Sequence, residues 1–175
     1  MTMTIPPIDS SKIIWIKSVD RHETPLWAYC GEDPAARHFE PQREGDEFDL
    51  HWHTRLRKNV QAPQRDEIIC LIQDKHVTHL VQVLDDQPHP RRPEDHRAQS
   101  QGTNTIARRV RALVMRGKGR APYCRQALRF VPRLQGGPCC RIAALSSFMK
   151  SQWPSEGGLA AFQQHLMRVL TGAAS

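Results

Sequence analysis

The chain has 175 residues, of which 39% are hydrophobic and 25% are charged, and its formal net charge is +7. This balance excludes an intrinsically disordered chain, and because no stretch approaches the ~20 apolar residues of a bilayer span, we expect no membrane partner. The length predicts one domain that buries about two thirds of the surface exposed by the unfolded chain.

The N-terminal stretch "MTMTIPPIDSSK" lacks the basic start and the apolar run of a secretory signal, so we expect a soluble, cytoplasmic protein. The five cysteines suit that compartment, because an odd number at uneven spacings is a poor basis for a disulfide framework. They are Cys30, Cys70, Cys124, Cys139 and Cys140, and we expect reduced thiols.

The first half of the chain predicts three strands separated by turn-rich segments. Residues 1–11 are expected to form a flexible tail, and a single domain follows over 12–175. The β-branched stretch "KIIWIKSV" (Lys12–Val19) predicts a strand, and "PLWAYC" (Pro25–Cys30) predicts a second. In "EFDLHWH" (Glu47–His53) apolar and polar residues alternate with the period of two that is typical of a half-buried strand.

Residues 66–86, "DEIICLIQDKHVTHLVQVLDD", predict a β-hairpin. The continuous apolar run from Ile68 to Ile72 is typical of a strand covered on both faces, and an alternating pattern follows from Val77. The polar bend "QDKH" between them is short enough to join two antiparallel strands. Residues 87–105 hold several prolines and almost nothing to bury, which predicts a long mobile loop or one that a ligand orders.

The C-terminal part predicts helices after one or two further strands. The stretch "IARRVRALVMRG" (Ile106–Gly117) fits a helix or a strand, and a strand is expected around Ala127–Val131. Two helices are predicted over 141–153 and 157–172, the second with an apolar stripe and a glycine after its end. The stripe is Leu159, Phe162, Leu166, Val169 and Leu170, and the glycine is Gly172. Strands followed by a helical tail predict an α+β domain with a compact, mostly antiparallel, barrel-like sheet.

The segment "HWHTRLRKNV" (His51–Val60) combines an aromatic ring with clustered cations. Aromatic faces stack bases and cations neutralise phosphates, which is the combination that recognition of a single-stranded or flipped base requires. Arg55 and Arg57 are two positions apart, so on an extended chain they project from one side. Two alternatives stay open: Trp52 fills the core or faces a ligand, and the arginines and Lys58 contact a polyanion or coat a solvated loop.

Two more basic stretches extend this hypothesis. The proline-rich loop after residue 87 carries Arg91 and Arg92, and it either closes over a nucleic-acid strand or is a solvent-exposed insertion. If the stretch that follows the loop is a strand, Arg109 and Arg111 share a face and lengthen a basic stripe. Because a basic chain attracts polyanions, we expect DNA or RNA as the partner.

The histidines make a weak case for a metal site. His51 and His53 share a strand face, and His76 and His79 are three positions apart, but zinc needs three or four converging ligands. No CxxC motif is present, so we expect no metal. The valines around His79 predict a core histidine whose ring nitrogens are satisfied within the protein.

A metal-dependent nuclease is the enzymatic alternative. Restriction-type nucleases hold Mg²⁺ with an acidic residue and with a carboxylate or glutamine two positions before a lysine. Asp66 and Glu67 precede "QDK" (Gln73–Lys75) here, but on one short strand instead of two neighbouring ones. No nucleophile-elbow, phosphate-loop or dinucleotide motif is present, so we expect no catalytic residue and no cofactor.

The order of four segments resembles the PUA-like superfamily, and within it the EVE and YTH-type branch. An early strand with a tryptophan, a tryptophan before a basic stretch, an aspartate that opens an apolar strand, and a returning strand correspond to "IIWIKSV", "WHTRLRKN", "RDEIICLI" and "THLVQVLDD". The resemblance spans about residues 12–115, and Arg65 stands where the family has a glycine before the aspartate.

This resemblance implies a small barrel that binds RNA or a modified base between its first strand and the basic stretch. One wall would consist of Trp15, Lys17 and Ser18. The other would consist of Trp52, Thr54, Arg55 and Asn59. Such modules occur in bacterial restriction and defence systems and in RNA modification, so the fold alone does not name the biology.

We therefore expect a non-enzymatic nucleic-acid-binding domain that reads a modified or flipped base through an aromatic pocket rimmed by arginine and lysine. The alternative is a protein-interaction module, or a subunit of a larger defence or nucleoprotein complex, that docks through its C-terminal amphipathic helix. An exposed stripe at Leu159, Phe162 and Leu166 would favour this alternative. Acidic groups that converge around Asp66 and Gln73 would favour the nuclease.

Overall fold

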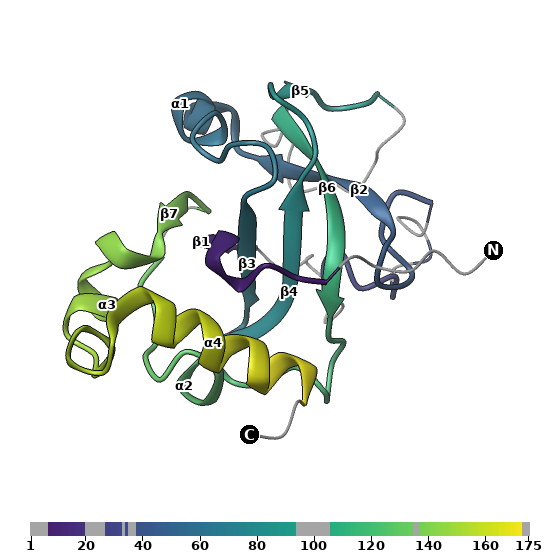
Figure 1. Cartoon of the computed structure of the whole chain (residues 1–175). Helices are drawn as coiled ribbons and strands as arrows, with labels where there is room; N and C mark the ends of the chain where they lie inside the picture. Colours follow the sequence, from purple (N-terminus) through teal and green to yellow (C-terminus); the bar gives the residue numbers. More distant parts are fainter. Residues whose placement is uncertain are drawn as a thin grey trace.

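A curled sheet and a layer of helices form the structure, a computed structural model that describes residues 7–19, 27–32, 34, 38–93, 106–134 and 137–172 (Figure 1). The strands are β1 Ile13–Ser18, β2 Glu47–Trp52, β3 Ile68–Gln73, β4 His76–Val83, β5 His89–Pro90, β6 Ile106–Met115 and β7 Cys139–Arg141. The α-helices are α1 Arg57–Val60, α2 Cys124–Ala127, α3 Ser146–Met149 and α4 Gly158–Thr171. The 3-10 helices are η1 Ser10–Lys12, η2 Thr54–Leu56, η4 Ile142–Ala144 and η5 Trp153–Ser155.

The sheet is mixed. Its strands follow the order β2-β6-β4-β3-β1-β7, and β5 pairs with β6. β1 runs parallel to β3, whereas the other pairings among these strands are antiparallel. A parallel pair needs a crossover, and the chain makes it by way of β2 at the opposite edge of the sheet. The predicted α+β class is consistent with this architecture, in which the sheet curls into half a barrel.

The predicted hairpin is confirmed as β3 and β4. The two residues of its turn, Asp74 and Lys75, have φ angles of 49° and 64°. This left-handed geometry matches the twist of the strands that a two-residue turn joins. All residues of β3 are buried, as expected for a strand that is covered on both faces.

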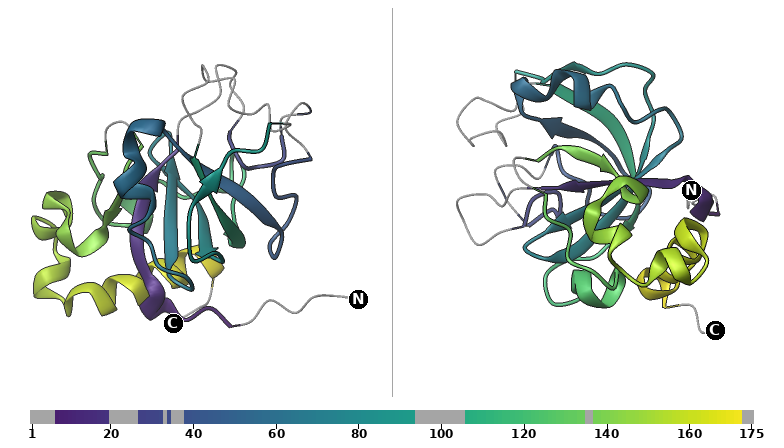
Figure 2. Two further views of the ribbon diagram at one scale, coloured as in Figure 1. Left: turned by 90° about the horizontal axis from the view of Figure 1, so that it is seen from above. Right: turned by 90° about the vertical axis from the view of Figure 1, so that its left-hand side faces the viewer.

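The two faces of the sheet carry separate hydrophobic clusters. On one face, Phe162 and Leu166 of α4 are buried against strand residues such as Ile16. On the other, concave face, Phe48 and Val81 belong to a second cluster, to which Trp15 and Trp52 also contribute. Figure 2 shows α4 lying across one side of the curled sheet, so the concave face opens away from this helix.

The C-terminal helix forms as predicted, and its apolar stripe packs within the chain. Phe162, Leu166 and Leu170 are buried, and Leu159 and Val169 are partly buried against the same cluster. The helix then ends at a glycine of positive φ, as the sequence predicts. Because the stripe is covered, the feature that would favour docking on a protein partner is missing from this helix.

Two predicted strands are wrong. The described part of Pro25–Cys30, residues 27–30, forms turns, and Tyr29 has a φ of 61°. Ala127–Val131 contains the end of α2 and irregular chain, with Arg129 at a φ of 60°. Both segments bury their apolar side chains from turns, so their apolar character indicated burial and not a strand.

Other boundaries also differ from the prediction. The helix expected over 141–153 is divided into the short turns η4, α3 and η5, whereas the ambiguous stretch from Ile106 is the long strand β6. Residues 1–6 of the predicted tail and 94–105 of the predicted loop lie outside the described residues. Among the described residues, no helix combines the length and the apolar character that crossing a membrane requires.

All five cysteines are free thiols, in agreement with the prediction. Burial raises the pKa of Cys30 and of Cys124 to about 12. The thiolate is the nucleophilic form of cysteine, so burial keeps these two thiols in their unreactive form.

Candidate nucleic-acid interface

The basic segment predicted to contact nucleic acid forms η2 and α1, directly after β2. The strand ends at Trp52, and the side chain of His53 caps η2 because its Nδ1 accepts the backbone N–H of Arg55 at 3.2 Å. The chain then turns through α1, which leaves Arg55, Arg57 and Lys58 exposed. Within the described part of the chain, these three side chains make no ion pair.

Asn59 connects this segment to the far edge of the sheet. Its Oδ1 accepts the indole N–H of Trp52 at 3.1 Å and the backbone N–H of Cys139 at 2.6 Å. Its Nδ2 donates to the carbonyl oxygen of Cys139, also at 2.6 Å. The amide of Asn59 therefore pairs with β7 as a neighbouring strand would, and it links β2 and β7, the two ends of the strand order.

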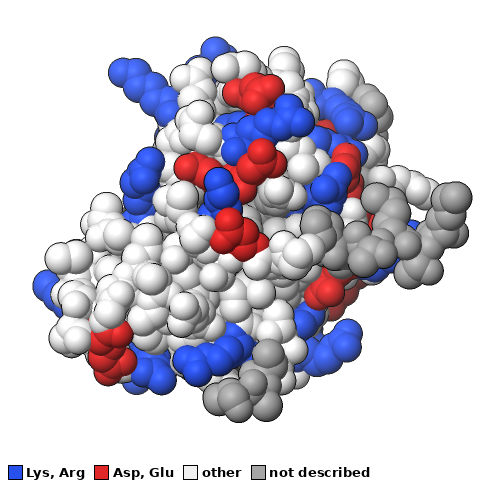
Figure 3. All heavy atoms as spheres, in the orientation of Figure 1, with Lys and Arg blue, Asp and Glu red and all other residues white. Residues whose placement is uncertain are grey.

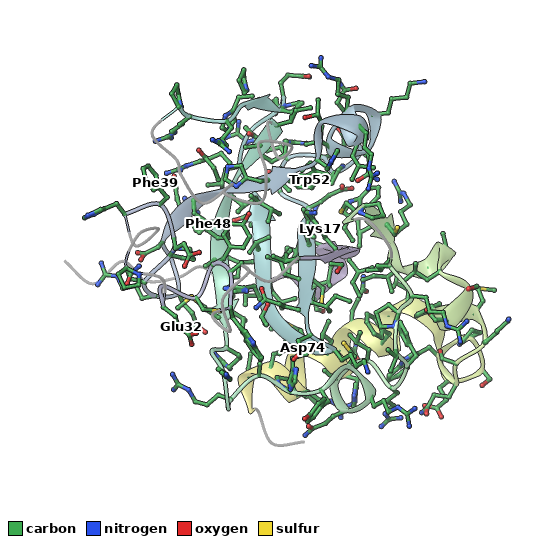
Figure 4. The ribbon with its side chains drawn as sticks, turned by 180° about the vertical axis from the view of Figure 1, so that it is seen from behind. Lys17, Glu32, Phe39, Phe48, Trp52 and Asp74 are labelled. Atoms are coloured by element: carbon green, nitrogen blue, oxygen red, sulfur yellow. The ribbon has the colours of Figure 1, made fainter. Side chains whose placement is uncertain are left out.

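Lys17 lies against Trp52 on the concave face. Its Nζ is 4.8 Å from the centre of the indole ring, and it donates to the carbonyl oxygen of Gly137 at 2.5 Å. Only 4% of Lys17 and none of Trp52 is exposed. Figure 4 looks onto this face and shows Lys17 and Trp52 side by side, with Phe48 further along β2. The alternative in which Trp52 belongs to the core is the one that the structure supports.

Trp15 is also engaged by its own chain. Its Nε1 donates to Glu67 at 2.6 Å, and the guanidinium of Arg141 lies 4.9 Å from the centre of its ring. Trp15 is 5% exposed, so one face is covered by this arginine and little of the ring remains accessible. Arg141 itself is exposed and makes no ion pair among the described residues. It is a cation of this region that the sequence reasoning missed.

The remaining residues of the two expected walls are separated from this group. Ser18 lines a different pocket of about 170 Å³ with Ile72 and Leu134, next to the hairpin turn. Thr54 is half-buried in η2, close in sequence to the exposed cations. The structure thus brings together Lys17, Trp52 and Asn59, with the cations of η2 and α1 outside them.

The predicted basic stripe on β6 is neutralised by acidic side chains. Arg109 pairs with Asp49 at 3.2 Å, and Arg111 pairs with Glu47 at 2.8 Å, so β2 supplies a carboxylate for each. Arg92 pairs with Asp49 at 3.1 Å, whereas Arg91 is half-buried and makes no ion pair within the described residues. On the side of the molecule that Figure 3 shows, positive and negative side chains are interleaved over the upper half.

Arg108 is a buried arginine that fixes the position of α1 and was not among the predicted residues. It is 0% exposed, and its Nε donates to Asp85 at 2.6 Å. Its Nη1 donates to the carbonyl oxygens of Val60, the last residue of α1, and of Pro63, at 2.9 and 2.8 Å. Arg108 lies two positions before the buried Val110 on β6. Residues two apart on a strand share a face, so the spacing from Val110 could have indicated that Arg108 points inward.

The described histidines that the sequence offered as metal ligands do not converge. His51 is buried, with Nδ1 3.1 Å from the hydroxyl of Tyr29, while His53 caps η2. His79 is fully buried, and its two ring nitrogens contact Thr78 Oγ1 at 2.9 Å and the carbonyl oxygen of Tyr29 at 2.8 Å. No group of three or more possible metal ligands occurs among the described residues. The predicted core histidine is confirmed.

The burial of His79 makes the stability of the protein depend on pH. Burial lowers its pKa from 6.5 to about 4, while the hydrogen bond to Tyr29 opposes this shift. The unfolded chain therefore takes up a proton first as the pH falls below 6.5, at a cost of about 1.4 kcal/mol per pH unit down to the folded pKa. Urea denaturation should show full stability at about pH 7 and a loss of about 2 kcal/mol at pH 5.

A matched variant isolates this contribution. His79→Gln removes the titrating group, so its free energy of unfolding should fall less between the two pH values than that of the unmodified protein. The quantity compared is the change in the free energy of unfolding between pH 7 and pH 5, and not its value at either pH. An equal fall in both proteins would show that other groups cause the pH dependence.

The acidic residues considered for a nuclease do not assemble. Asp66 precedes β3 and Gln73 ends it, which separates them by about 20 Å at ~3.3 Å per residue. Glu67 accepts the indole N–H of Trp15, and the side-chain oxygen of Gln73 accepts the backbone N–H of Ala28 at 3.0 Å. The convergence that would favour this enzyme is therefore not present around these residues.

Comparisons with known proteins found no match. No protein-family model, no curated protein and no solved structure matches the chain. The resemblance to the PUA-like superfamily stays a prediction.

Proposed function

We propose that the protein binds single-stranded nucleic acid through the surface formed by η2, α1 and the end of β7. The observation that carries this proposal is a group of four exposed cations without ion pairs among the described residues. They are Arg55, Arg57, Lys58 and Arg141. Because their charge is not neutralised by the protein, it is available to phosphates.

Hydrogen bonds fix the backbone of α1, which favours defined contacts between its cations and phosphates. Asn59 ties α1 to Cys139 in β7, two residues before Arg141. Arg108 donates to the carbonyl oxygens of Val60, at the end of α1, and of Pro63. Side chains presented from a fixed backbone lose less conformational freedom on binding, so more of the electrostatic attraction remains as affinity.

The paired arginines of β6 are a less suitable surface. Arg109 and Arg111 lie on one face as predicted, but a phosphate there would compete with Asp49 and Glu47. Asp49 is 4% exposed on its side chain, so its negative charge is poorly screened by solvent. We therefore place the phosphate contacts on α1 and β7 and not on the outer face of β6.

Recognition of a modified or flipped base, and the PUA-like barrel that this implies, remain part of the proposal as a prediction. The curl of the sheet and the Lys17–Trp52 contact are compatible with it. Both candidate rings, Trp15 and Trp52, are covered by the chain's own residues. A base that reached either ring would have to displace part of that cover.

The experiment is a binding titration of labelled oligonucleotides as the salt concentration is raised. The triple variant Arg55→Ala/Arg57→Ala/Lys58→Ala removes three phosphate contacts, so the slope of log K against log salt should become shallower by about 2. We expect its affinity at low salt to fall at least about tenfold. Single- and double-stranded DNA and RNA, with and without modified bases, are compared in the same series.

The control variant removes the same charge elsewhere. Lys12, Lys150 and Arg168 are exposed cations near the ends of η1, α3 and α4, and their triple alanine variant should keep nearly the original affinity. Equal losses in both triple variants would mean that net charge alone drives binding. An absence of binding to every oligonucleotide at low salt would refute the proposed function.

A further inference from the structure

An exposed aromatic ring lies at the other end of the hairpin from α1. Tyr123 is 61% exposed, and among the described large apolar side chains only Met149, at 60%, is similarly open. The ring of Tyr123 lies 4.1 Å from that of His76, which in turn lies 5.1 Å from the ring of Trp27. Trp27 is 4% exposed. The three rings thus form a short column that runs from the buried Trp27 to the exposed Tyr123, with successive rings tilted by 49° and 34°.

The backbone fixes the orientation of this column. His76 and Tyr123 form an isolated antiparallel bridge. The N–H of Val77 donates to the carbonyl oxygen of Pro122 at 2.9 Å, and the N–H of Cys124 donates to that of Lys75 at 2.7 Å. The chain before α2 is therefore bound to the end of the hairpin on both sides of Tyr123. An exposed ring that is held in this way is pre-organised for stacking.

Exposed cations lie close to Tyr123 along the chain and in the hairpin turn that is bonded to it. Lys75 lies in the hairpin turn, and Lys118, Arg120 and Arg125 belong to the stretch "RGKGRAPYCR" that carries Tyr123. All four are exposed, and none makes an ion pair within the described part of the chain. Gly119, between two of them, has a φ of 84°, and nothing lies within 4 Å of the position that a Cβ would take, so this loop can approach a ligand closely.

We propose that Tyr123 is a stacking platform for a base of single-stranded nucleic acid, with Lys75, Arg120 and Arg125 as its phosphate contacts. This inference rests on the proposed function and supplies the aromatic contact that Trp15 and Trp52 do not offer. A flat ring with free cations around it binds any base, because every base has a π face and every nucleotide a phosphate. The platform therefore adds affinity without reading the sequence.

The position of Tyr123 predicts how long the bound strand must be. α1 lies near the end of β4 and Tyr123 near its start, and Figure 2 shows α1 and α2 at opposite ends of the molecule. The eight residues of β4 span about 26 Å at ~3.3 Å per residue. At the ~3.4 Å per nucleotide of a stacked strand, both sites together need about eight nucleotides.

The test compares Tyr123→Ala and Tyr123→Phe in binding to oligothymidylates of about four and about 16 nucleotides. Loss of one stacked base should weaken binding of the longer strand about tenfold in the alanine variant. The phenylalanine variant, which keeps the ring, should bind as the original protein does. Met149→Ala, which removes the other exposed apolar side chain, should have no effect. Because Tyr123 is 61% exposed, the melting temperature of its variants should stay unchanged.

A photo-crosslinking experiment locates the contact directly. With an oligothymidylate that contains a photoreactive base, trypsin should release a crosslinked peptide of residues 121–125, "APYCR". The inference is overturned if Tyr123→Ala binds the longer strand normally and this peptide is not labelled. In that outcome a loss in the Arg55, Arg57 and Lys58 variant still supports the proposed function. The reverse pattern, a loss only in Tyr123→Ala, supports the platform and rejects the α1 surface.

Discussion

Replacement of Arg108 by alanine is expected to lower the free energy of unfolding by about 3–5 kcal/mol. The guanidinium is fully buried and donates to Asp85 and to the carbonyl oxygens of Val60 and Pro63. Its removal leaves a carboxylate and two carbonyl groups without their partner. Breaking a buried pair by removing one member is costly because the other charge stays in a poorly solvated place.

Urea denaturation measures this loss, and two further variants show where it comes from. Arg108→Lys keeps the charge but not the planar fork that reaches several acceptors at once, so we expect an intermediate stability. Arg65→Ala breaks a pair with Asp86 in which both side chains are more than half exposed, and it should cost less than about 1 kcal/mol. A change of under 1 kcal/mol in Arg108→Ala would contradict the structural role assigned to this residue.

The effect on binding follows from the position of Arg108. It holds the backbone at Val60 and Pro63 and so fixes the end of α1, while its own charge is fully buried. A folded Arg108→Lys variant should therefore bind oligonucleotides more weakly with an unchanged salt slope, since no phosphate contact is lost. A shallower slope would instead place Arg108 among the residues that touch the ligand.

The parts of the fold that could be predicted are those with local signals. The run from Ile68 to Ile72 and the polar bend after it predict the hairpin, because a two-residue turn sets the pairing of its two strands within one short segment. The spacing of Phe162, Leu166 and Leu170 likewise identifies α4. Pairings between distant segments carry no such signal. The parallel pairing of β1 with β3 depends on a crossover, and the residues of the two strands do not indicate which path that crossover takes.

For the candidate site, the sequence indicates which basic and aromatic residues are present, but not which of them are exposed, buried or paired. The sequence shows that cations gather in 55–58 and around 109, but only the fold neutralises Arg109 and Arg111, because Asp49 and Glu47 approach them when β2 pairs with β6. Burial of Trp52 depends in the same way on Asn59 and β7. A cluster of cations in sequence therefore predicts charge, whereas the fold decides which of the charges remain free.

Replacement of Asn59 by alanine is expected to cost about 3 kcal/mol, since a buried polar group left without a partner costs about 1–3 kcal/mol. The amide of Asn59 satisfies the indole N–H of Trp52 and both backbone groups of Cys139. Trp52 is 0% and Cys139 is 2% exposed, so water replaces these bonds poorly. Gln64→Ala, at an exposed amide that contacts only Ala62 with its Nε2, should change the stability by less than about 0.5 kcal/mol.

The variant Asn59→Asp separates the roles of the two ends of the amide. A carboxylate still accepts from Trp52 and from the N–H of Cys139, but it cannot donate to the carbonyl oxygen of Cys139 and is repelled by it. If the link between α1 and β7 holds the cations in place, both variants should weaken oligonucleotide binding while the salt slope stays constant, because every cation is retained. Unchanged affinity in a folded Asn59→Ala protein would mean that phosphate binding does not need the link that Asn59 makes between α1 and β7. The cations of α1 would then act as a flexible charged segment and not as a fixed surface.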